Sequence, residues 1–400
     1  MPNTMATLDA ITKEVYQGKI QNQLQEEAVG YKRILRTSSG VESQVGGKYV
    51  TFPLRVRRNA GIGYRNELEQ LQNAGQQGFI SVRIGLKYGY GRVRMSGPSM
   101  ELASENYQAF ADAMDLEMTY LKSDIAKDTN RVFYGDGLGT LATVSTAGTA
   151  DNVVAVVSTQ YLEVGQQIDI VNAGVGPGVG GASAIAYNRQ ITAISGLNVT
   201  FDGAAVADTV GHILTRTGNW NREPNGLASI VKATGILFTV DPTTQPLWKS
   251  VVNANGGTGR ALSEGLMIKL TDDVRVNGGK TSLILTSLGV RRAYFNLLSQ
   301  QRRYVNTKEF DGGLTGLAFN NGREIPVVED PDAPPGKMWF LDESKFKIYR
   351  DKDWSWLQKD GSVWKWVHDY DAYEAVLKQY WEMGLNQRNA QGLLDDVTEA

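Results

Sequence analysis

The sequence has 400 residues, of which 42% are apolar and 21% are charged, and its formal net charge is −2. This length fits two or three domains with a sizeable buried core, so we expect neither a disordered chain nor a generally basic nucleic-acid coat, although a locally basic face stays compatible with the composition. The absence of cysteine excludes disulfides, zinc-thiolate sites, iron–sulfur clusters and thiol catalysis, and two histidines are too few for a multi-histidine metal centre.

The N-terminal region predicts a soluble protein made in a cytoplasm. Its first residues, MPNTMATLDAITKEVY, lack the basic stretch and apolar core of a secretory signal, and no run reaches the roughly 18 apolar residues of a membrane span. Residues 6–36 have apolar side chains at helical spacing, interrupted by Gly18 and Gly30, which indicates an amphipathic N-terminal arm.

Residues 45–97 predict a projecting β-arm. Two stretches of alternating side chains, 49–56 and 79–95, flank a loop of about twenty residues, which is too long for a compact hairpin. The arm is basic, with nine cations against Glu67 and Glu69. The cations are Lys48, Arg55, Arg57, Arg58, Arg65, Arg83, Lys87, Arg92 and Arg94.

Residues 98–134 have the clearest helical pattern in the sequence. Apolar side chains recur at steps of three and four between Tyr107 and Val132, Pro98 suits the first turn, and Gly135 suits the position after the end. At 1.5 Å per residue such a helix is roughly 55 Å long, so we expect a strut rather than part of a small domain. It is acidic, with the carboxylates Glu101, Glu105, Asp112, Asp115, Glu117, Asp124 and Asp128 against three cations.

The rest of the chain divides by composition. Residues 141–222 carry little charge and contain short strand-like segments about every ten residues, which predicts a small antiparallel barrel or sandwich inserted into the chain. Mixed α/β structure follows, with helices expected at 261–276 and 287–298 and strands at 282–286, 325–328 and 337–341. Residues 345–385 are expected to be β-rich, and Asp360 and Gly361 to form a hairpin turn between two tryptophan-bearing strands.

No motif in the sequence nominates a catalytic or cofactor site, and we expect no cofactor. NGGKTS at 277–282 has Val274 where a phosphate-binding loop needs its first glycine, and a strand rather than a helix follows it. GVGPGVGG at 174–181 is likewise followed by a β-like segment, so a surface loop is favoured over a dinucleotide site. His212 and His368 are expected to make ordinary polar contacts. The four tryptophans at 354–366 are expected to pack on both faces of a sheet rather than to form one stacking platform.

The basic arm and the acidic strut are the candidate functional elements. One interpretation is that both are merely solvated faces. The other is that the arm of one subunit lies across the strut of its neighbour, where such charges would set the register and the association rate more than the affinity.

The order of these parts resembles the HK97-fold major capsid proteins of tailed phages, including those with an inserted domain like the P22 coat protein. The resemblance covers nearly the whole chain and depends on an ordered series of strings rather than on one sharp motif. They are KYGYGRVRMSG, RVFYGDG, NREPNGL, SLILTSLGVRRAYFNLL, REIPVVEDPDAPPGKMWFLD and DYDAYEAVLKQYWEMGLNQRNAQG.

The resemblance implies an α+β, HK97-like capsid fold with an extended β-arm (the E-loop), a long spine helix, peripheral and axial domains and an all-β insertion domain. The implied divisions are an N-terminal arm (1–44), the E-loop (45–97), the spine helix of the peripheral domain (98–135), the axial domain (136–140 and 223–340), the insertion (141–222) and the C-terminal strands of the peripheral domain (341–400). It implies a virion shell of homo-hexamers and homo-pentamers around packaged double-stranded DNA, assembled in the host cytoplasm with a portal protein and without a membrane.

Two departures from the family pattern affect this interpretation. No helical region of about a hundred residues precedes the arm, so we expect a separate scaffolding protein. The arm tip, roughly 59–78, contains no lysine, so a lysine–asparagine crosslink cannot be carried over and we expect non-covalent stabilisation.

The rival interpretations are an encapsulin-like cargo shell, an enzyme with a β-insertion, and a tail-tube or adhesin protein. Encapsulins are typically shorter, the sequence nominates no catalytic pocket, and a tail or adhesin protein leaves the long acidic helix unexplained.

Overall fold

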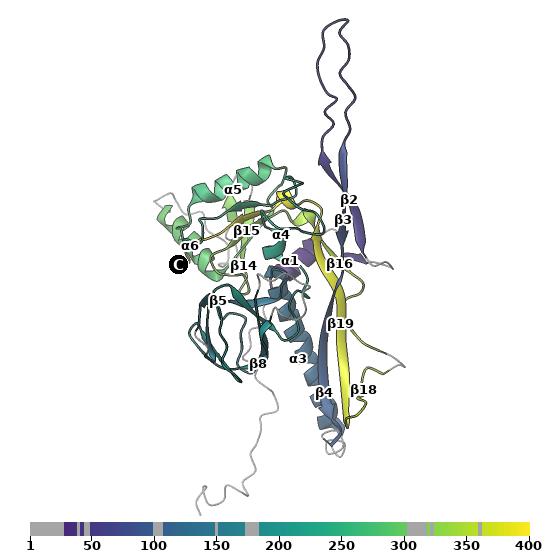
Figure 1. Ribbon diagram of the computed structural model, residues 1–400, viewed down its shortest axis with the longest axis vertical. Helices are drawn as coiled ribbons and strands as arrows, with labels where there is room; N and C mark the ends of the chain where they lie inside the picture. Colours follow the sequence, from purple (N-terminus) through teal and green to yellow (C-terminus); the bar gives the residue numbers. More distant parts are fainter. Residues whose placement is uncertain are drawn as a thin grey trace, which may run out of the picture.

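The computed structural model describes residues 28–37, 41–43, 49–98, 107–148, 151–172, 184–301, 318–320, 324–358 and 362–400. The described chain is α+β, with a long helix, a closed barrel, two six-stranded sheets and one projecting hairpin (Figure 1). In the described part, no helix is both long enough and apolar enough to span a bilayer.

The first sheet is organised around β19 (Ala372–Leu385), its longest strand. One edge of β19 pairs with β4 (Lys87–Ser96) over ten antiparallel residue pairs. Along the other edge lie, one after another, β16 (Phe346–Arg350), β17 (Ser355–Trp356) and β18 (Lys365–Trp366), and β1 (Val41–Ser43) pairs in parallel with β16. The predicted hairpin between the two tryptophan-bearing strands is therefore wrong, because β17 and β18 each pair with β19 and not with each other. The predicted turn at Asp360 and Gly361 lies outside the described residues.

The helix α3 (Tyr107–Tyr134) packs along β4 and ends before Gly135, as the sequence predicts (Figure 1). The predicted start at Pro98 cannot be compared, because residues 99–106 lie outside the described residues. Close approach of the helix to the sheet depends on Gly91, where a Cβ atom would come within 2.3 Å of the Ile125 side chain. A larger residue at this position would require the end of the Ile125 side chain to shift.

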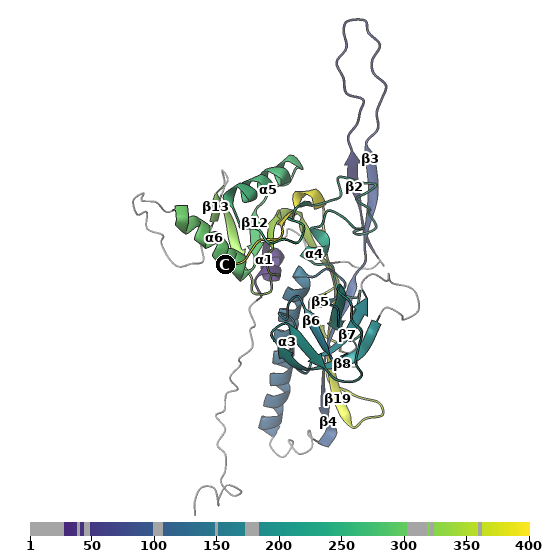
Figure 2. The same cartoon turned by 60° about the vertical axis from the view of Figure 1, so that its left-hand side comes forward.

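The predicted strands between 141 and 222 are confirmed as a closed antiparallel barrel beside α3 (Figure 2). Its strands are β5 (Thr140–Thr146), β6 (Val153–Val156), β7 (Gln167–Asn172), β8 (Ala184–Ser195), β9 (Asn198–Phe201) and β10 (His212–Arg216). β5 has no counterpart among the predicted strands, and it closes the barrel by pairing with both β6 and β10. The barrel has its own buried cluster, from Leu141 to Leu214, and the predicted loop at 174–183 lies outside the described residues.

The second sheet has the order β11-β20-β15-β12-β14-β13, with α5 and α6 packed against it. Its elements are β11 (Val251–Asn253), α5 (Glu264–Val276), β12 (Leu283–Thr286), α6 (Leu288–Gln301), β13 (Ala318–Asn320), β14 (Glu324–Glu329), β15 (Met338–Leu341) and β20 (Gly392–Leu394). The helices and strands predicted in this region are confirmed to within three residues at each end.

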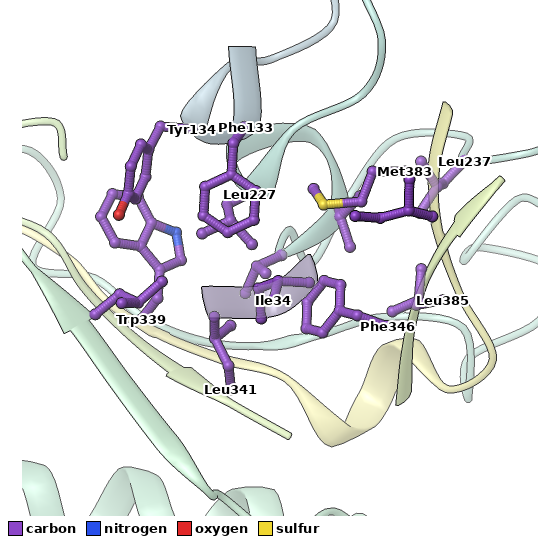
Figure 3. Packing of buried hydrophobic residues seen from close by; sticks show 14 of the residues in the cluster. Ile34, Phe133, Tyr134, Leu227, Leu237, Trp339, Leu341, Phe346, Met383 and Leu385 are labelled. Carbon is purple, nitrogen blue, oxygen red and sulfur yellow. The ribbon is translucent and has the colours of Figure 1, made fainter. Parts of the chain in front are cut away.

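The main core lies where the two sheets, α3 and two short helices meet (Figure 3). The short helices are α1 (Gly30–Thr37) and α4 (Leu227–Ile230). Ile34 of α1, Phe133 of α3 and Phe346 of β16 are fully buried there. Within the predicted N-terminal arm, Gly30 begins a helix instead of interrupting one, and residues 1–27 lie outside the described part.

Candidate intersubunit contact surfaces

The projecting arm consists of β2 (Val50–Arg57), β3 (Gly78–Ile84) and the connection 58–77 (Figure 1). The prediction of one alternating stretch over 79–95 is wrong, because β3 and β4 are separate strands with different partners, β2 and β19 respectively. Only the β2–β3 hairpin therefore projects, and the part of the predicted E-loop from 87 onward runs along the body.

The two faces of the hairpin differ because side chains alternate along each strand. Phe52, Leu54 and Ile80 lie on one face, which reaches the main core at Val82 and Ile84. Arg55, Arg57 and Arg83 are exposed on the other face, and Arg55 is paired across the strands with the exposed Phe79.

The tip of the arm exposes large apolar side chains almost completely. The exposed fractions are 83% for Ile62, 99% for Tyr64, 101% for Leu68 and 82% for Leu71. Leu68 also has a φ of 67°, a left-handed conformation that is strained for leucine. A group of exposed apolar side chains on a projecting element indicates a contact surface for another protein molecule.

Local hydrogen bonds give this tip a defined shape. Gly61 N donates to Asn59 Oδ1 at 2.7 Å, Gln72 Nε2 donates to Gly61 O, and the Glu69 carboxylate accepts from both the backbone and the side-chain amide of Asn66. These bonds to Asn66 lower the pKa of Glu69. The apolar side chains are thus held outward on an organised loop.

The predicted basic residues of the arm fall into two groups. Arg55, Arg57, Arg58 and Arg65 are exposed and form no ion pair with the described residues. Arg92 and Arg94 lie on β4 instead, and both approach the Glu374 carboxylate at 3.5 Å within the subunit. Lys87 donates to Asn221 O at 3.0 Å, and Lys48 lies outside the described residues.

The predicted acidic residues of the spine helix are also divided. Glu101 and Glu105 lie outside the described residues, and Asp112 and Asp115 are on α3 but their side chains are not described. Glu117 and Asp124 are exposed on α3. Asp128 contacts Arg131 at 2.8 Å and Arg216 at 2.9 Å inside the subunit. An intersubunit role for these acidic residues and for the basic residues of the arm stays a prediction.

Asp128 belongs to an internal ion-pair network between α3 and the barrel that the sequence analysis missed. Arg131 contacts both Asp128 and Glu223, the latter at 2.5 Å, and Arg216 of β10 completes the network. Burial by itself would lower the pKa of Arg131, but the two carboxylates outweigh it and raise that pKa. Burial would raise the pKa of Asp128, but the guanidinium groups of Arg131 and Arg216 outweigh it and lower that pKa.

A second buried network joins α1, α3 and the loop after β14. The Asp330 carboxylate accepts from Gly30 N at 2.6 Å, from Asn130 Nδ2 at 3.0 Å and from Tyr134 Oη at 3.1 Å. Lys127 contacts Asp332 at 2.6 Å. Asn130 is flanked by Thr129 and Arg131, so no local pattern in the sequence marks this contact.

NGGKTS and the two histidines make ordinary structural contacts. Lys280 leads into β12, and its backbone N–H donates to Asp342 Oδ2, so no helix follows NGGKTS. His212 Nδ1 accepts from Thr209 N at 2.9 Å, and His368 contacts Asp369. Among the described residues, no group of three histidine, cysteine or acidic side chains is placed to hold a metal ion.

The fold is that of a virus capsid protein. The cyanophage A-1(L) capsid asymmetric unit superposes with a TM-score of 0.63 at 14% identity, over 99% of this chain and 100% of that one. The capsid of the native GTA particle gives a TM-score of 0.56 at 12% identity, over the whole of both chains. No curated protein matches the sequence.

Residues 111–363 match the family described as SU10 major capsid protein, and the chain therefore belongs to that family. It is a major capsid protein of a tailed bacteriophage, a structural shell subunit and not an enzyme. The matched range includes the described part of α3 from residue 111 onward, the barrel and most of the second sheet, and leaves out the arm.

Proposed function

We propose that the chain assembles as homo-hexamers and homo-pentamers into an icosahedral shell around packaged double-stranded DNA, with the arm of each subunit docked on a neighbouring subunit. The observation that carries this proposal is the arm itself, whose tip presents Ile62, Tyr64, Leu68 and Leu71 to solvent. In the isolated subunit these apolar side chains stay in water. Their burial against another copy in a shell would provide favourable free energy for assembly.

The acidic face of a neighbour's α3 is the proposed counter-surface for the arm. Arg55, Arg57 and Arg58 have no ion-pair partner among the described residues of their own subunit, and Glu117 is exposed on α3. Because Asp128 is engaged with Arg131 and Arg216, we place the contact toward the N-terminal half of the helix. Opposite charges there would set the register in which the apolar tip docks.

The finer architecture that we propose is HK97-like. In it, α3 and the first sheet form the peripheral domain, the second sheet with α5 and α6 forms the axial domain, and the barrel is an insertion on the axial domain. The path of the chain supports the insertion of the barrel. The chain enters the barrel through residues 136–140 and leaves it through residues 217–226, and these two segments lie side by side, since Asn221 N donates to Leu138 O at 2.9 Å. Assembly in the host cytoplasm with a separate scaffolding protein and a portal protein belongs to the same proposal.

Charge reversal on the arm tests the docking proposal. The triple variant Arg55→Glu, Arg57→Glu, Arg58→Glu should fold with an unchanged thermal transition but form no shells when expressed with the neighbouring phage genes and viewed by electron microscopy. A matched control reverses three exposed cations of the body, Lys269, Arg275 and Lys280, which changes the net charge equally. Shells of normal number and size from the arm variant would contradict the proposal.

Expression of residues 136–222 alone tests the insertion proposal. The barrel is closed and encloses its own apolar cluster, so the fragment should be soluble, keep β-type circular dichroism and unfold cooperatively in urea. A fragment without a cooperative transition would show that the barrel depends on α3 and the second sheet.

A further inference from the structure

Arg388 is a buried cation whose guanidinium donates hydrogen bonds to backbone carbonyls. Its residue is 1% exposed. Nε donates to Ile230 O at 2.9 Å, Nη1 to Gly235 O at 3.2 Å and Trp248 O at 3.3 Å, and Nη2 to Ser229 O at 3.3 Å. Burial lowers the pKa of Arg388 to about 10. Burying a charge without a carboxylate partner costs free energy. The hydrogen bonds to the four carbonyls offset part of this cost, and they fix the backbone segment that carries those carbonyls.

Those carbonyls lie on one segment, residues 229–250, which we name the bracket. Its turn is closed by the paired backbones of Leu237 and Val240, with Phe238 at a φ of 51° and Thr239 at a φ of 71°. Trp248 Nε1 donates to Leu237 O at 3.2 Å across the bracket. Two bulky residues in the left-handed region make this turn unfavourable by itself, so the bracket depends on its surroundings for its shape.

The bracket braces the base of the arm. Arg83 N of β3 donates to Phe238 O at 3.4 Å, and Leu237 and Val240 belong to the same buried cluster as Val82 and Ile84 of β3. Arg388, which lies between β19 and β20, therefore connects the link between the two sheets to the bracket, whose turn contacts the base of the arm.

A small change at this base becomes a large displacement at the tip. From Thr51, the residue paired with Arg83, to Leu68 the arm can extend about 55 Å at roughly 3.3 Å per residue. A tilt of about 10° at the base then displaces the tip by about 10 Å, which is larger than the width of a leucine side chain. Docking of the tip on a neighbour would fail at such an offset.

We propose that Arg388 is a positioning residue for assembly, which sets the direction of the arm by holding the bracket in shape. The biological consequence rests on the proposed docking of the arm, but the direction of the arm is measurable in the unassembled subunit. The two proposals can therefore fail separately.

Distances between spin labels on full-length, unassembled subunits test this role. The protein has no native cysteine, so the pair Gln70→Cys at the tip and Lys269→Cys on α5 is labelled selectively. In Arg388→Met the distance distribution should broaden at least twofold and its mean should shift by several ångströms. Arg388→Lys, which keeps the charge but loses the fork of donors, should give an intermediate width.

Two further variants keep the test decisive. Ile168→Val weakens the barrel core without touching the bracket and should leave the distribution unchanged even where it lowers the melting temperature. Ser250→Ala removes the hydroxyl that bonds Arg388 O at 2.9 Å, and it provides a milder perturbation should Arg388→Met fail to fold. A lower melting temperature with an unchanged tip distribution in the Arg388 and Ser250 variants would overturn the proposal and leave Arg388 as a stabilising residue only.

Discussion

Replacement of the two leucines at the arm tip by polar residues, Leu68→Asn with Leu71→Ser, should separate folding from assembly. Both side chains are already in water in the subunit, at 101% and 82% exposure. Their loss should therefore change the free energy of unfolding by no more than about 0.5 kcal/mol. Asparagine also accepts the left-handed backbone of Leu68 better than leucine does, so the subunit should be unchanged or slightly stabilised.

The effect on assembly follows from the apolar surface that the neighbour would cover. Burial of one leucine side chain contributes about 1.5–3 kcal/mol, so two leucines contribute about 3–6 kcal/mol per docked arm. This corresponds to a roughly 10²- to 10⁴-fold weaker contact. Each subunit has one arm, so every proposed arm contact in the shell would lose this free energy.

Sedimentation velocity across a range of subunit concentrations, paired with thermal unfolding of the same samples, measures both quantities. We expect an unchanged melting temperature and a large increase in the concentration at which shells first form. Val276→Ser, at a position 86% exposed at the end of α5, is the control for a general loss of exposed apolar surface. Shells that form at the wild-type concentration would show that the tip stays in solvent and would refute the docking argument.

Three further predictions concern the subunit itself. Burial raises the pKa of Glu382 from 4.5 to about 8, so its contribution to stability is fully present below pH 4.5 and is lost as the pH rises through 8. Glu382→Gln should therefore raise the free energy of unfolding, measured in urea at pH 8.5, by at most about 5 kcal/mol. At pH 4.5 the same variant should hardly change the free energy of unfolding. Glu223→Ala leaves Arg131 buried with one of its two carboxylates removed and should cost about 3 kcal/mol in urea unfolding. Gly91→Ala places a methyl group against the end of the Ile125 side chain, which must shift, and should cost about 1 kcal/mol, measured as a lower melting temperature.

Controls for these variants are available within the same chain. Gly85→Ala places a methyl group at an ordinary contact distance of 3.5 Å and should be nearly neutral beside Gly91→Ala. The double variant Arg131→Met, Glu223→Leu removes both charges and should cost less than Glu223→Ala. A pH profile that stays parallel between wild type and Glu382→Gln would contradict the assigned titration.

The spacing of apolar residues along the sequence predicted those helices and strands that bury side chains at regular intervals. The apolar steps of α3, the buried run of β12 and the short strands of the barrel were visible because a helix or strand must bury side chains at its own period. The failures have a common cause. β3 and β4 were read as one strand because both alternate, and the pairing of β17 and β18 was misassigned because strand partners are chosen across the fold and not along the chain.

The candidate contact surfaces divide in the same way. The sequence identified the arm as basic and extended, but it placed Arg92 and Arg94 on the arm although β19 provides their partner, Glu374. It also overlooked the apolar tip, because Ile62 and Leu68 are ordinary residues until their exposure is known. The Arg131–Glu223 contact spans 92 residues of sequence and has no local signature.

The sequence by itself determined that this chain has a long acidic helix, a cationic extended segment and a β-rich middle region, because charge and periodicity are properties of neighbouring residues. Only the tertiary structure decided which cations form no ion pair within the described part of the subunit, which apolar side chains reach solvent and how the arm is braced at its base. Those properties depend on burial and on contacts between distant segments, and burial exists only after the chain has folded.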